Sequence, residues 1–385
     1  MKSITILGAT GSIGDSTVDI CRQHPHRFTV KAITAHSNVE KLAELARSLE
    51  PDLAVIGDET RYSDLKDALS DTNIGVAAGP EALVEAAEQP VDLLISAIVG
   101  AAALQPTLAA VKKGTTVALA NKECLVCAGD LVMNAAKQSG ARVLPVDSEH
   151  NAIFQVFDRD RPEGVRRLIL TASGGPFRTR AIDTLKSVTP AEAVAHPNWD
   201  MGAKISVDSA TMMNKGLEVV EAYHLFPVTP EQIDVVIHPQ SIVHSMVEYA
   251  DSSVLAQMGT PDMRTPIAYA MAWPDRITSD VETLNLASIG TLTFESPDFE
   301  RFPCLALAKA ALAEGEGATL ALNAANEIAV AAFLDHQIKF LDIPKVVEET
   351  VGKRAFKAPQ SLETVVAADK AARDSAKAIV ERLTV

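Results

Sequence analysis

Hydrophobic and polar positions alternate along the first 147 residues in a way that predicts strands and helices following one another. Short apolar runs are separated by amphipathic stretches such as "NVEKLAELARSLE" (38–50) and "PTLAAVKKG" (106–114). Strands that alternate with helices are typical of a doubly wound parallel sheet. We therefore expect an α/β domain with strands at Ser3–Leu7, Thr29–Thr34, Leu53–Ile56, Leu93–Ile98, Thr116–Ala120 and Arg142–Val146.

The pattern changes after Asp147. An apolar run, "RLILTASGG", is followed by segments of alternating polarity such as "IDVVIHPQSIVHSMVEY", which predict an α+β domain with a more open sheet. A stretch rich in Ser, Thr, Asp and Pro is typical of a linker, and the Ala-rich remainder predicts a small helical bundle. The expected parts are a Rossmann-like domain over 1–147, an α+β domain over 148–273, a linker over 274–298 and a C-terminal helical domain over 299–385.

Composition narrows the class of protein. The 385 residues carry a net charge of −15, which argues against a nucleic-acid partner because phosphate contacts need clustered Lys and Arg. No apolar run is long enough to predict a membrane span, and the N-terminus enters a strand at once instead of forming a signal peptide. Four cysteines do not make a disulfide scaffold. We expect a cytoplasmic protein without a membrane partner.

Three glycines follow the first predicted strand directly and precede a helical stretch. Gly8, Gly11 and Gly14 would permit a tight turn and would let backbone N–H groups and a helix N-terminus face a pyrophosphate. Their spacing is GxxGxxG rather than GxGxxG, and the alternative is a tight turn in an unrelated α/β fold. The order of strand, turn and helix favours a dinucleotide site.

The end of the second strand indicates which dinucleotide binds. NAD sites usually place an Asp or Glu there for the ribose 2′-hydroxyl. Here the strand leads into His36, Ser37 and Asn38, which include no carboxylate. This favours NADP, although no Arg or Lys replaces the acid.

Asp147 and Glu149 form the first candidate cluster for chemistry. Asp147 follows a predicted strand, and ligands of open parallel sheets gather at the carboxyl ends of strands. Equally, Asp147 or Ser148 could cap the helix that follows, with Glu149 suiting its first turn, at a gain of about 1 kcal/mol and with no chemistry. Both interpretations stay open from these residues alone.

A second cluster lies in the helical stretch "SVDSATMMNKGLEVVEAY". Asn214 and Glu218 lie four residues apart on one face, next to Lys215, and Ser209 precedes them. A solvated Lys215–Glu218 pair is the alternative to a pocket for a phosphate or polyol. Three carboxylates, namely those of Asp147, Glu149 and Glu218, could together supply oxygen ligands that suit Mg²⁺ or Mn²⁺.

Two loops add further candidates. Ser173 is followed by two glycines after an apolar strand, so this loop could form a backbone nest for an anion, or simply a turn. The loop "AHPNWDMG" carries His196, Trp199, Met201 and Gly202, and it could close over a ligand as a lid or be a static loop anchored by Trp199. The pair Cys124 and Cys127 is interpreted as chance spacing on a packed helix.

Taken together, these motifs resemble one family. The segments "GATGSIG", "ALANKE", "PVDSEHNAIFQ", "ASGGPFR", "HPNWDMGAKISVDSATMMNKGLE", "IHPQSIVHSMV" and "ALNAANEIAVAAFL" resemble the 1-deoxy-D-xylulose 5-phosphate reductoisomerases, in order and through nearly the whole chain. The resemblance implies NADPH- and metal-dependent conversion of 1-deoxy-D-xylulose 5-phosphate to 2-C-methyl-D-erythritol 4-phosphate in the non-mevalonate isoprenoid pathway. It also implies a homodimer with a phosphorylated sugar as substrate.

The resemblance implies a role for each matching residue. Asp147, Glu149 and Glu218 would bind the metal, with Lys122, Glu149 and Glu218 as the catalytic residues. The lid would contain Trp199 and Met201. Substrate would contact Lys122, Ser148, Glu149, Ser173, His196, Ser209, Asn214, Lys215 and Glu218. NADPH would contact Thr10, Gly11, Ser12, Ile13, His36, Ser37, Asn38, Asn121, Glu123 and Gly202.

Two other functions remain compatible with the residues. One is another NADP-dependent dehydrogenase, of the homoserine or semialdehyde type. The other is a non-catalytic dinucleotide-binding regulator, which has no use for three carboxylates. At His36–Ser37 some relatives have a Gly–basic pair, so the strength of NADP over NAD selection is not fixed by the resemblance.

Overall fold

The computed structural model describes residues 1–195, 199, 201–353 and 356–384. These residues form two compact units. The first contains Met1–Cys124, Val132–Asn151 and Asp262–Glu282, and the second contains Leu125–Leu131, Ala152–Pro261 and Thr283–Val385. The chain therefore passes between the units several times. The division into four parts at 147, 273 and 298 stays a prediction.

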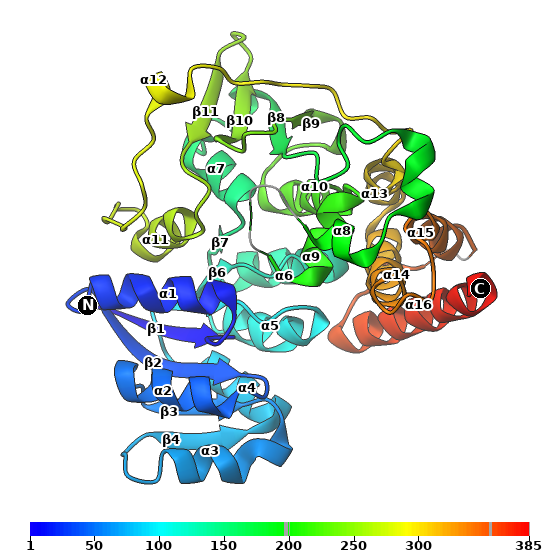
Figure 1. The fold of residues 1–385 in the computed structure, drawn as a ribbon. Helices are drawn as coiled ribbons and strands as arrows, with labels where there is room; N and C mark the ends of the chain where they lie inside the picture. The colour runs from blue at the N-terminus through cyan, green and yellow to red at the C-terminus, as the bar shows by residue number, and fades with distance from the viewer. Residues whose placement is uncertain (196–198, 200, 354–355, 385) are drawn as a thin grey trace. The chain divides into compact units, whose positions relative to one another are not determined.

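The first unit is built on a seven-stranded, fully parallel sheet (Figure 1). Its strand order, β4-β3-β2-β1-β5-β6-β7, reverses between β1 and β5, which confirms the predicted doubly wound sheet. The strands are β1 (Lys2–Leu7), β2 (Phe28–Ala35), β3 (Leu53–Ile56), β4 (Gly75–Ala78), β5 (Leu93–Ser96), β6 (Thr116–Leu119) and β7 (Val143–Pro145).

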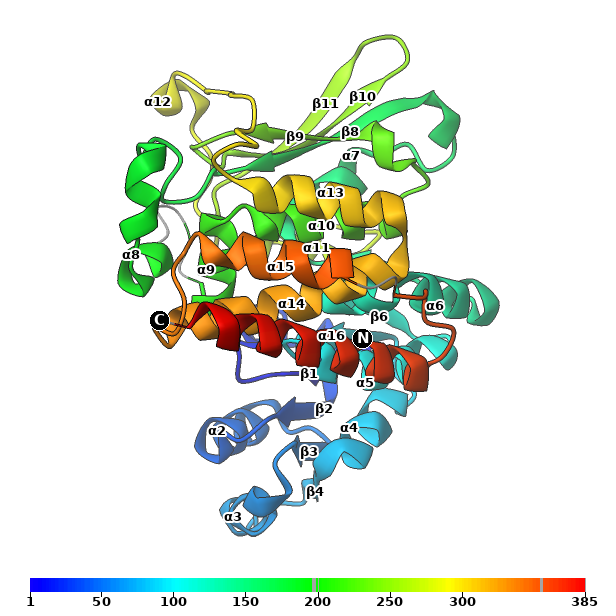
Figure 2. The same ribbon diagram turned by 90° about the vertical axis from the view of Figure 1, so that its right-hand side faces the viewer.

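Helices cover both faces of this sheet. Figure 2 shows α2 and α4 on opposite sides of strands β2 and β3, as right-handed crossovers require when the winding direction reverses. The helices are α1 (Ser12–Gln23), α2 (Val39–Leu49), α3 (Tyr62–Ala68), α4 (Gly79–Glu88), α5 (Leu104–Lys112) and α11 (Arg264–Ala272), with parts of α6 (Glu123–Ser139) and α7 (Ser148–Val156).

Strand β4 was not predicted from the sequence. Its four residues, "GVAA", include no large apolar side chain, and none of them is fully buried. It forms because its backbone pairs with β3 at the edge of the sheet, from Leu53 opposite Gly75 to Ile56 opposite Ala78. Backbone pairing, rather than side-chain burial, therefore defines this strand.

Helix α11 belongs to the first unit although it is distant in sequence. It packs against α1, and the Lys2 ammonium donates to the carbonyl oxygens of Met271 and Trp273 at 3.1 and 2.8 Å. The buried Asn151 amide donates to the Pro266 carbonyl at 3.3 Å. These bonds tie residues 262–282 to the start of the chain.

The second unit contains a four-stranded sheet of order β11-β10-β8-β9, in which β8 and β9 are parallel and the other pairs are antiparallel. This mixed sheet agrees with the expected α+β arrangement. Its strands are β8 (Val165–Ala172), β9 (Ile233–Ile237), β10 (Val243–Tyr249) and β11 (Val254–Met258).

One continuous apolar core joins this sheet to the helices of the second unit, including those near the C-terminus. The helices are α8 (Pro190–Val194), α9 (Ala203–Ala210), α10 (Met213–Leu225), α12 (Leu286–Ile289), α13 (Pro303–Glu314), α14 (Glu316–Leu334), α15 (Asp342–Lys353) and α16 (Leu362–Leu383). Short 3-10 turns of both units are Glu59–Arg61, Ala101–Ala103, Pro162–Gly164, Ile182–Ser187 and Pro230–Gln232.

Helix α14 lies at the centre of the C-terminal helices. It is the one helix of the described residues that is long and apolar enough to cross a membrane by composition, with a mean hydropathy of 1.3. However, 78% of its most apolar 18-residue stretch is buried inside the protein, as is typical of a core helix. Its burial against α13, α15 and α16 accounts for its apolar character.

Helix α6 is kinked within the segment that belongs to the second unit. Ala128 has non-helical angles (φ −153°, ψ 36°), which removes regular helical partners from nearby backbone groups. Side chains of α14 replace them: the Thr319 hydroxyl donates to the Val126 carbonyl at 2.8 Å, and the Glu316 carboxylate accepts from the Asp130 N–H at 2.8 Å. Burial raises the pKa of Glu316 to about 7.

Candidate active site

The glycine loop lies at the carboxyl end of β1, beside the point where the strand order reverses. Gly8 has φ +82°, and a Cβ there would lie 2.6 Å from the carbonyl oxygen of Ala97, which follows β5. A Cβ on Gly14 would lie 2.4 Å from the carbonyl oxygen of Ala9. Ligands of open parallel sheets bind at this reversal. Both glycines are thus required by close backbone approach at the expected nucleotide site.

Gly11 differs from these two glycines, because no close contact in the structure excludes a side chain there. It precedes α1, is exposed, and would have no atom closer than 3.6 Å to an added Cβ. The fold therefore leaves space in front of the N-terminus of α1, where backbone N–H groups can bind a phosphate. Thr10, Ser12 and Ile13 flank this space.

The end of β2 carries the second part of the expected nucleotide site. His36 and Ser37 are exposed, and the Asn38 side chain caps α2 by accepting from the Lys41 N–H at 3.0 Å. The Lys41 ammonium lies 2.6 Å from the Asp15 carboxylate and 3.1 Å from the Thr10 carbonyl oxygen. Sequence reasoning missed Lys41, a cation in the first turn of α2 that joins this turn to the glycine loop.

Asn121 and Glu123 connect β6 to the start of α6. Asn121 is 4% exposed, and its amide donates to the carbonyl oxygens of Ile98 and Gly100 and to the Glu123 carboxylate, at 2.8, 3.1 and 2.9 Å. Its own oxygen accepts from the Cys124 N–H. Asn121 therefore fixes the loop after β5 against the loop after β6. Cys124 and Cys127 are both buried on α6.

Asp147 and Glu149 follow β7 in the first unit. The Lys122 ammonium lies 2.8 Å from the Asp147 carboxylate, and both side chains are largely buried, at 12% and 15% exposed. The Ser148 hydroxyl donates to the Glu149 carboxylate at 2.5 Å, and Glu149 lies in the first turn of α7. The structure thus brings Lys122, Asp147, Ser148 and Glu149 to the same edge of the sheet.

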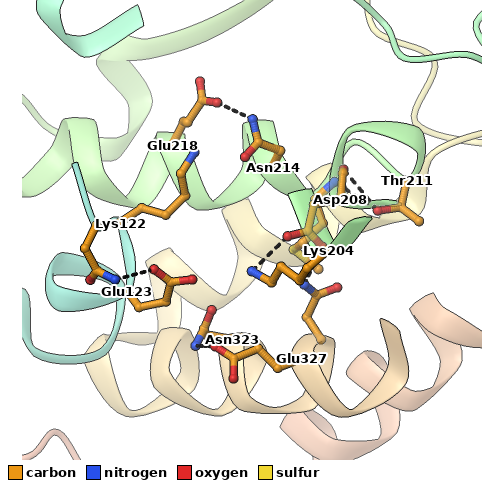
Figure 3. A network of polar contacts seen from close by, with 12 residues as sticks. Lys122, Glu123, Lys204, Asp208, Thr211, Asn214, Glu218, Asn323 and Glu327 are labelled. Carbon is orange, nitrogen blue, oxygen red and sulfur yellow. Dashed lines mark hydrogen bonds and ion pairs between the residues drawn. The ribbon is translucent and has the colours of Figure 1, made fainter. Parts of the chain in front are cut away.

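Asn214, Lys215 and Glu218 form a cluster on α10 in the second unit. Glu218 is 1% exposed, and it accepts from the Asn214 amide at 2.5 Å (Figure 3). It also pairs with the Lys215 ammonium. The pair is therefore buried, and the alternative of a solvated ion pair is wrong. A cation and a carboxylate held together without water interact far more strongly than an exposed pair.

The helical stretch that contains this cluster is two helices rather than one. Met212 adopts a left-handed conformation (φ +63°) between α9 and α10. The C-terminal end of α9, which carries Ser209, is therefore directly followed by a second helix N-terminus that carries Asn214 and Lys215. Sequence periodicity continues across Met212, so it gave no sign of the break.

The loop after β8 packs against the end of α9. Gly175 has φ +69°, and a Cβ there would lie 2.6 Å from the Ser209 carbonyl oxygen. The Ser173 hydroxyl accepts from the Gly175 N–H at 3.2 Å. Both Ser173 and Ser209 are partly exposed. The structure therefore places the Ser173 loop directly beside Ser209, as an anion site made from both would need.

The expected lid is described in part. The Trp199 ring lies beside His244 of β10, with ring centroids 6.4 Å apart. Met201 is partly buried and Gly202, expected to contact the nucleotide, is exposed just before α9. The expected substrate residue His196 lies outside the described residues.

Three family models match this chain. The model described as 1-deoxy-D-xylulose 5-phosphate reductoisomerase matches residues 4–129. Two models of C-terminal domains of the same enzyme match residues 143–226 and 258–375. Together they cover most of both units.

Curated relatives match over nearly their whole length. The 1-deoxy-D-xylulose 5-phosphate reductoisomerase of Rhodospirillum centenum is 57% identical over 99% of this chain and 94% of its own, and that of Ralstonia nicotianae is 58% identical over 98% of each. The structure of the Zymomonas mobilis enzyme in complex with NADPH has a TM-score of 0.94 at 51% identity, covering 99% of this chain and 98% of its own. A reductoisomerase complex with NADPH, fosmidomycin and magnesium has a TM-score of 0.95 at 47% identity, covering 100% and 99%.

Proposed function

Because the chain belongs to the 1-deoxy-D-xylulose 5-phosphate reductoisomerase family, we propose that it converts 1-deoxy-D-xylulose 5-phosphate to 2-C-methyl-D-erythritol 4-phosphate with NADPH and a divalent metal. The structural observation that carries most weight is the close approach of Gly175 to Ser209, which joins two serine-bearing segments into one candidate phosphate site. We propose that the rearrangement and the reduction both take place at this one site.

The nucleotide site we propose is formed mainly by the first unit. The glycine loop and the N-terminus of α1 would bind the pyrophosphate, and the end of β2 would bind the adenosine ribose and its 2′-phosphate. The bound cofactor supplies the hydride of the reduction. Residues assigned to it are Thr10, Gly11, Ser12, Ile13, His36, Ser37, Asn38, Asn121 and Glu123, with Gly202 from the second unit.

For the metal we propose Asp147 and Glu149 from the first unit and Glu218 from the second. Their chemistry fits the ion, since all three offer carboxylate oxygens, which Mg²⁺ and Mn²⁺ prefer to nitrogen or sulfur. Buried or partly buried carboxylates also need compensating charge, and Lys122 and Lys215 supply part of it beside Asp147 and Glu218. When bound, the metal would polarise the substrate's carbonyl and hydroxyl oxygens as a Lewis acid.

The chain's own residues would hold the substrate at both ends. Ser173, Ser209, Asn214 and Lys215 would bind the phosphate, and this remote binding energy would orient the reacting carbons. The Ser148 hydroxyl holds one oxygen of Glu149 by its hydrogen bond, which would orient that carboxylate toward the substrate. Lys122 stabilises the ionised form of Asp147. Trp199 and Met201, with His196 on the substrate side, would close over the site and exclude water.

We also propose that the protein is a cytoplasmic homodimer. Four buried cysteines without a disulfide scaffold suit a reducing compartment. A surface for a second copy is offered by the exposed face of the four-stranded sheet, where Ile169, Val236, Met246 and Phe294 line a pocket that also contains the Arg167–Asp234 ion pair. Sedimentation at several concentrations tests this assignment, and a monomer at micromolar concentration would contradict it.

One assay tests the proposed activity. Purified protein is mixed with NADPH and 1-deoxy-D-xylulose 5-phosphate, with Mg²⁺, with Mn²⁺ or with excess chelator, and both NADPH oxidation and the carbon skeleton of the product are measured. We expect turnover only with metal, and a branched product. Reduction without rearrangement would favour the homoserine- or semialdehyde-type dehydrogenase. NADPH binding without turnover under any metal condition would favour the regulator.

A further inference from the structure

Asp208 on α9 is a buried carboxylate that the proposed chemistry does not use. It is 1% exposed. One oxygen lies 2.9 Å from the ammonium of Lys204 on the same helix (Figure 3). The other accepts from the Asn326 amide of α14 at 2.7 Å. Its backbone carbonyl accepts from the Thr211 hydroxyl at 3.2 Å. The contacts to Lys204 and Thr211 lie within α9 and its C-terminal cap, whereas the bond to Asn326 fixes α9 relative to α14.

The bond to Asn326 is part of a polar stripe on an otherwise apolar helix. Asn326 is fully buried, and Asn323, one turn earlier, donates to Glu327 at 3.1 Å. Glu327 pairs with Arg373 of α16 at 2.5 Å. The polar residues of the motif "ALNAANEIAV" have no role in the proposed reaction, and these contacts give them a structural one. The stripe links α9, through α14, to the last helix of the chain.

The position of α9 gives this link a consequence. The helix begins after Gly202 of the expected lid and ends beside Ser209, the residue that follows Asp208. On its other side, the backbone of Ser209 lies against Gly175 and the Ser173 loop. The end of α9 is therefore held from two sides, by the Ser173 loop and by α14.

A purely stabilising role is a poor explanation for a charge at this site. Replacing a buried ion pair by apolar side chains is often neutral or stabilising, so buried pairs are weak devices for stability alone. A charge-assisted hydrogen bond, in contrast, restricts the direction and distance of its partner. The contact between Asp208 and Asn326 fixes the rotation of α9 about its axis in a way that apolar packing would not.

We propose that Asp208 is a positioning residue for the phosphate end of the substrate: by binding Asn326, it locks the end of α9 so that Ser209 stays beside the Ser173 loop. The inference rests on the proposed function, because it assigns Ser173 and Ser209 to the substrate phosphate. Asp208 itself does not contact substrate. Its effect is transmitted through the adjacent residue and the backbone of α9.

The test measures KM and kcat in Asp208→Asn and Asn326→Leu. Both should raise the KM for 1-deoxy-D-xylulose 5-phosphate about tenfold or more, with a smaller change in kcat, because displacement of a binding group by about 1 Å can cost up to ~100-fold. The KM for NADPH should stay unchanged. The exchanged pair Asp208→Asn/Asn326→Asp restores one carboxylate and one amide to the contact, so it should recover most of the substrate KM.

Asp342→Asn is the matched control. Asp342 is also buried, pairs with Lys345 at 2.8 Å, and accepts from the Lys339 N–H at 3.0 Å, but it lies on α15, which packs mainly against α14 and α16. It should lower the unfolding temperature and leave the substrate KM unchanged.

Three outcomes would overturn the inference: an unchanged substrate KM in folded Asp208→Asn, an equal rise in Asp342→Asn, or no recovery in the exchanged pair. Should Asp208→Asn fail to fold, Asn326→Leu and the exchanged pair still decide. A wild-type protein without turnover would refute the proposed function instead, and calorimetric binding of inorganic phosphate to wild type and Asp208→Asn would then test the positioning role directly.

Discussion

Replacing Gly175 by Ala should separate the two serines that we assign to the substrate phosphate. Gly175 has φ +69°, and the added Cβ would lie 2.6 Å from the carbonyl oxygen and 3.1 Å from the carbonyl carbon of Ser209. Ordinary contacts begin at 3.4 Å, so the loop and the end of α9 must move apart by about 0.8 Å. The contacting atoms are backbone, so no side chain can rotate to relieve the overlap.

The expected size of the effect follows from this displacement. The left-handed conformation costs a non-glycine residue about 1–2 kcal/mol of folding stability. A shift of about 1 Å in a positioning group can reduce activity by up to ~100-fold. We therefore expect the KM for 1-deoxy-D-xylulose 5-phosphate to rise by about 10- to 100-fold. The KM for NADPH should not change, because its binding residues lie mainly in the first unit.

Gly290→Ala separates the two contributions. Gly290 has the same φ of +69°, but an added Cβ would meet no atom within 4 Å. With ψ −52° it should lose stability through backbone strain alone and keep the wild-type KM. Steady-state kinetics with thermal unfolding of both variants gives the comparison. A wild-type substrate KM in Gly175→Ala, or an equal rise in Gly290→Ala, would refute the reasoning.

Three further predictions follow from single contacts. Glu218→Gln should abolish turnover and keep NADPH affinity. It should also lower the free energy of unfolding by about 3 kcal/mol, because the buried Lys215 ammonium loses its carboxylate partner. Normal turnover in this variant would remove Glu218 from the proposed metal site. Gly11→Ala should raise the KM for NADPH at an unchanged unfolding temperature. Gly14→Ala should also lower the unfolding temperature, because only the Cβ added at Gly14 would overlap the Ala9 backbone. Equal unfolding temperatures of the two variants would contradict this distinction. Burial raises the pKa of Glu316 from 4.5 to about 7, so between these pH values the folded protein binds more protons than the unfolded chain. The contribution of Glu316 to the free energy of unfolding therefore falls as pH rises from 4.5 through 7. In urea unfolding at several pH values, Glu316→Gln should reduce that fall, and an identical pH profile would show that Glu316 does not cause it.

Local pattern was sufficient for much of the first unit. The strands β1, β2, β3, β5, β6 and β7 follow from apolar runs, because a strand buried on both faces needs such side chains along its length. The role of Gly8 and Gly14 was also predictable, since a strand-to-helix turn at the start of a parallel sheet imposes close backbone approach. Asn214 and Glu218 meet because residues four apart share a helix face.

Other features depend on partners that are distant in the sequence. β4 has a weak pattern of its own and exists because β3 offers it backbone hydrogen bonds. The break at Met212 occurs within a continuous helical pattern. The burial of the Lys215–Glu218 pair could not be predicted from spacing either, because exposed ion pairs on helices have the same spacing.

The sequence by itself therefore determined the sheet of the first unit, the nucleotide loop and the residue types that suit a metal and a phosphate. Only the tertiary structure decided that Gly175 meets Ser209, that Asp208 meets Asn326, and that residues 262–282 return to pack with the start of the chain. The physical reason is range. Propensity and periodicity act over a few residues, whereas these contacts join segments that are far apart in the sequence and form only when the apolar core of each unit closes.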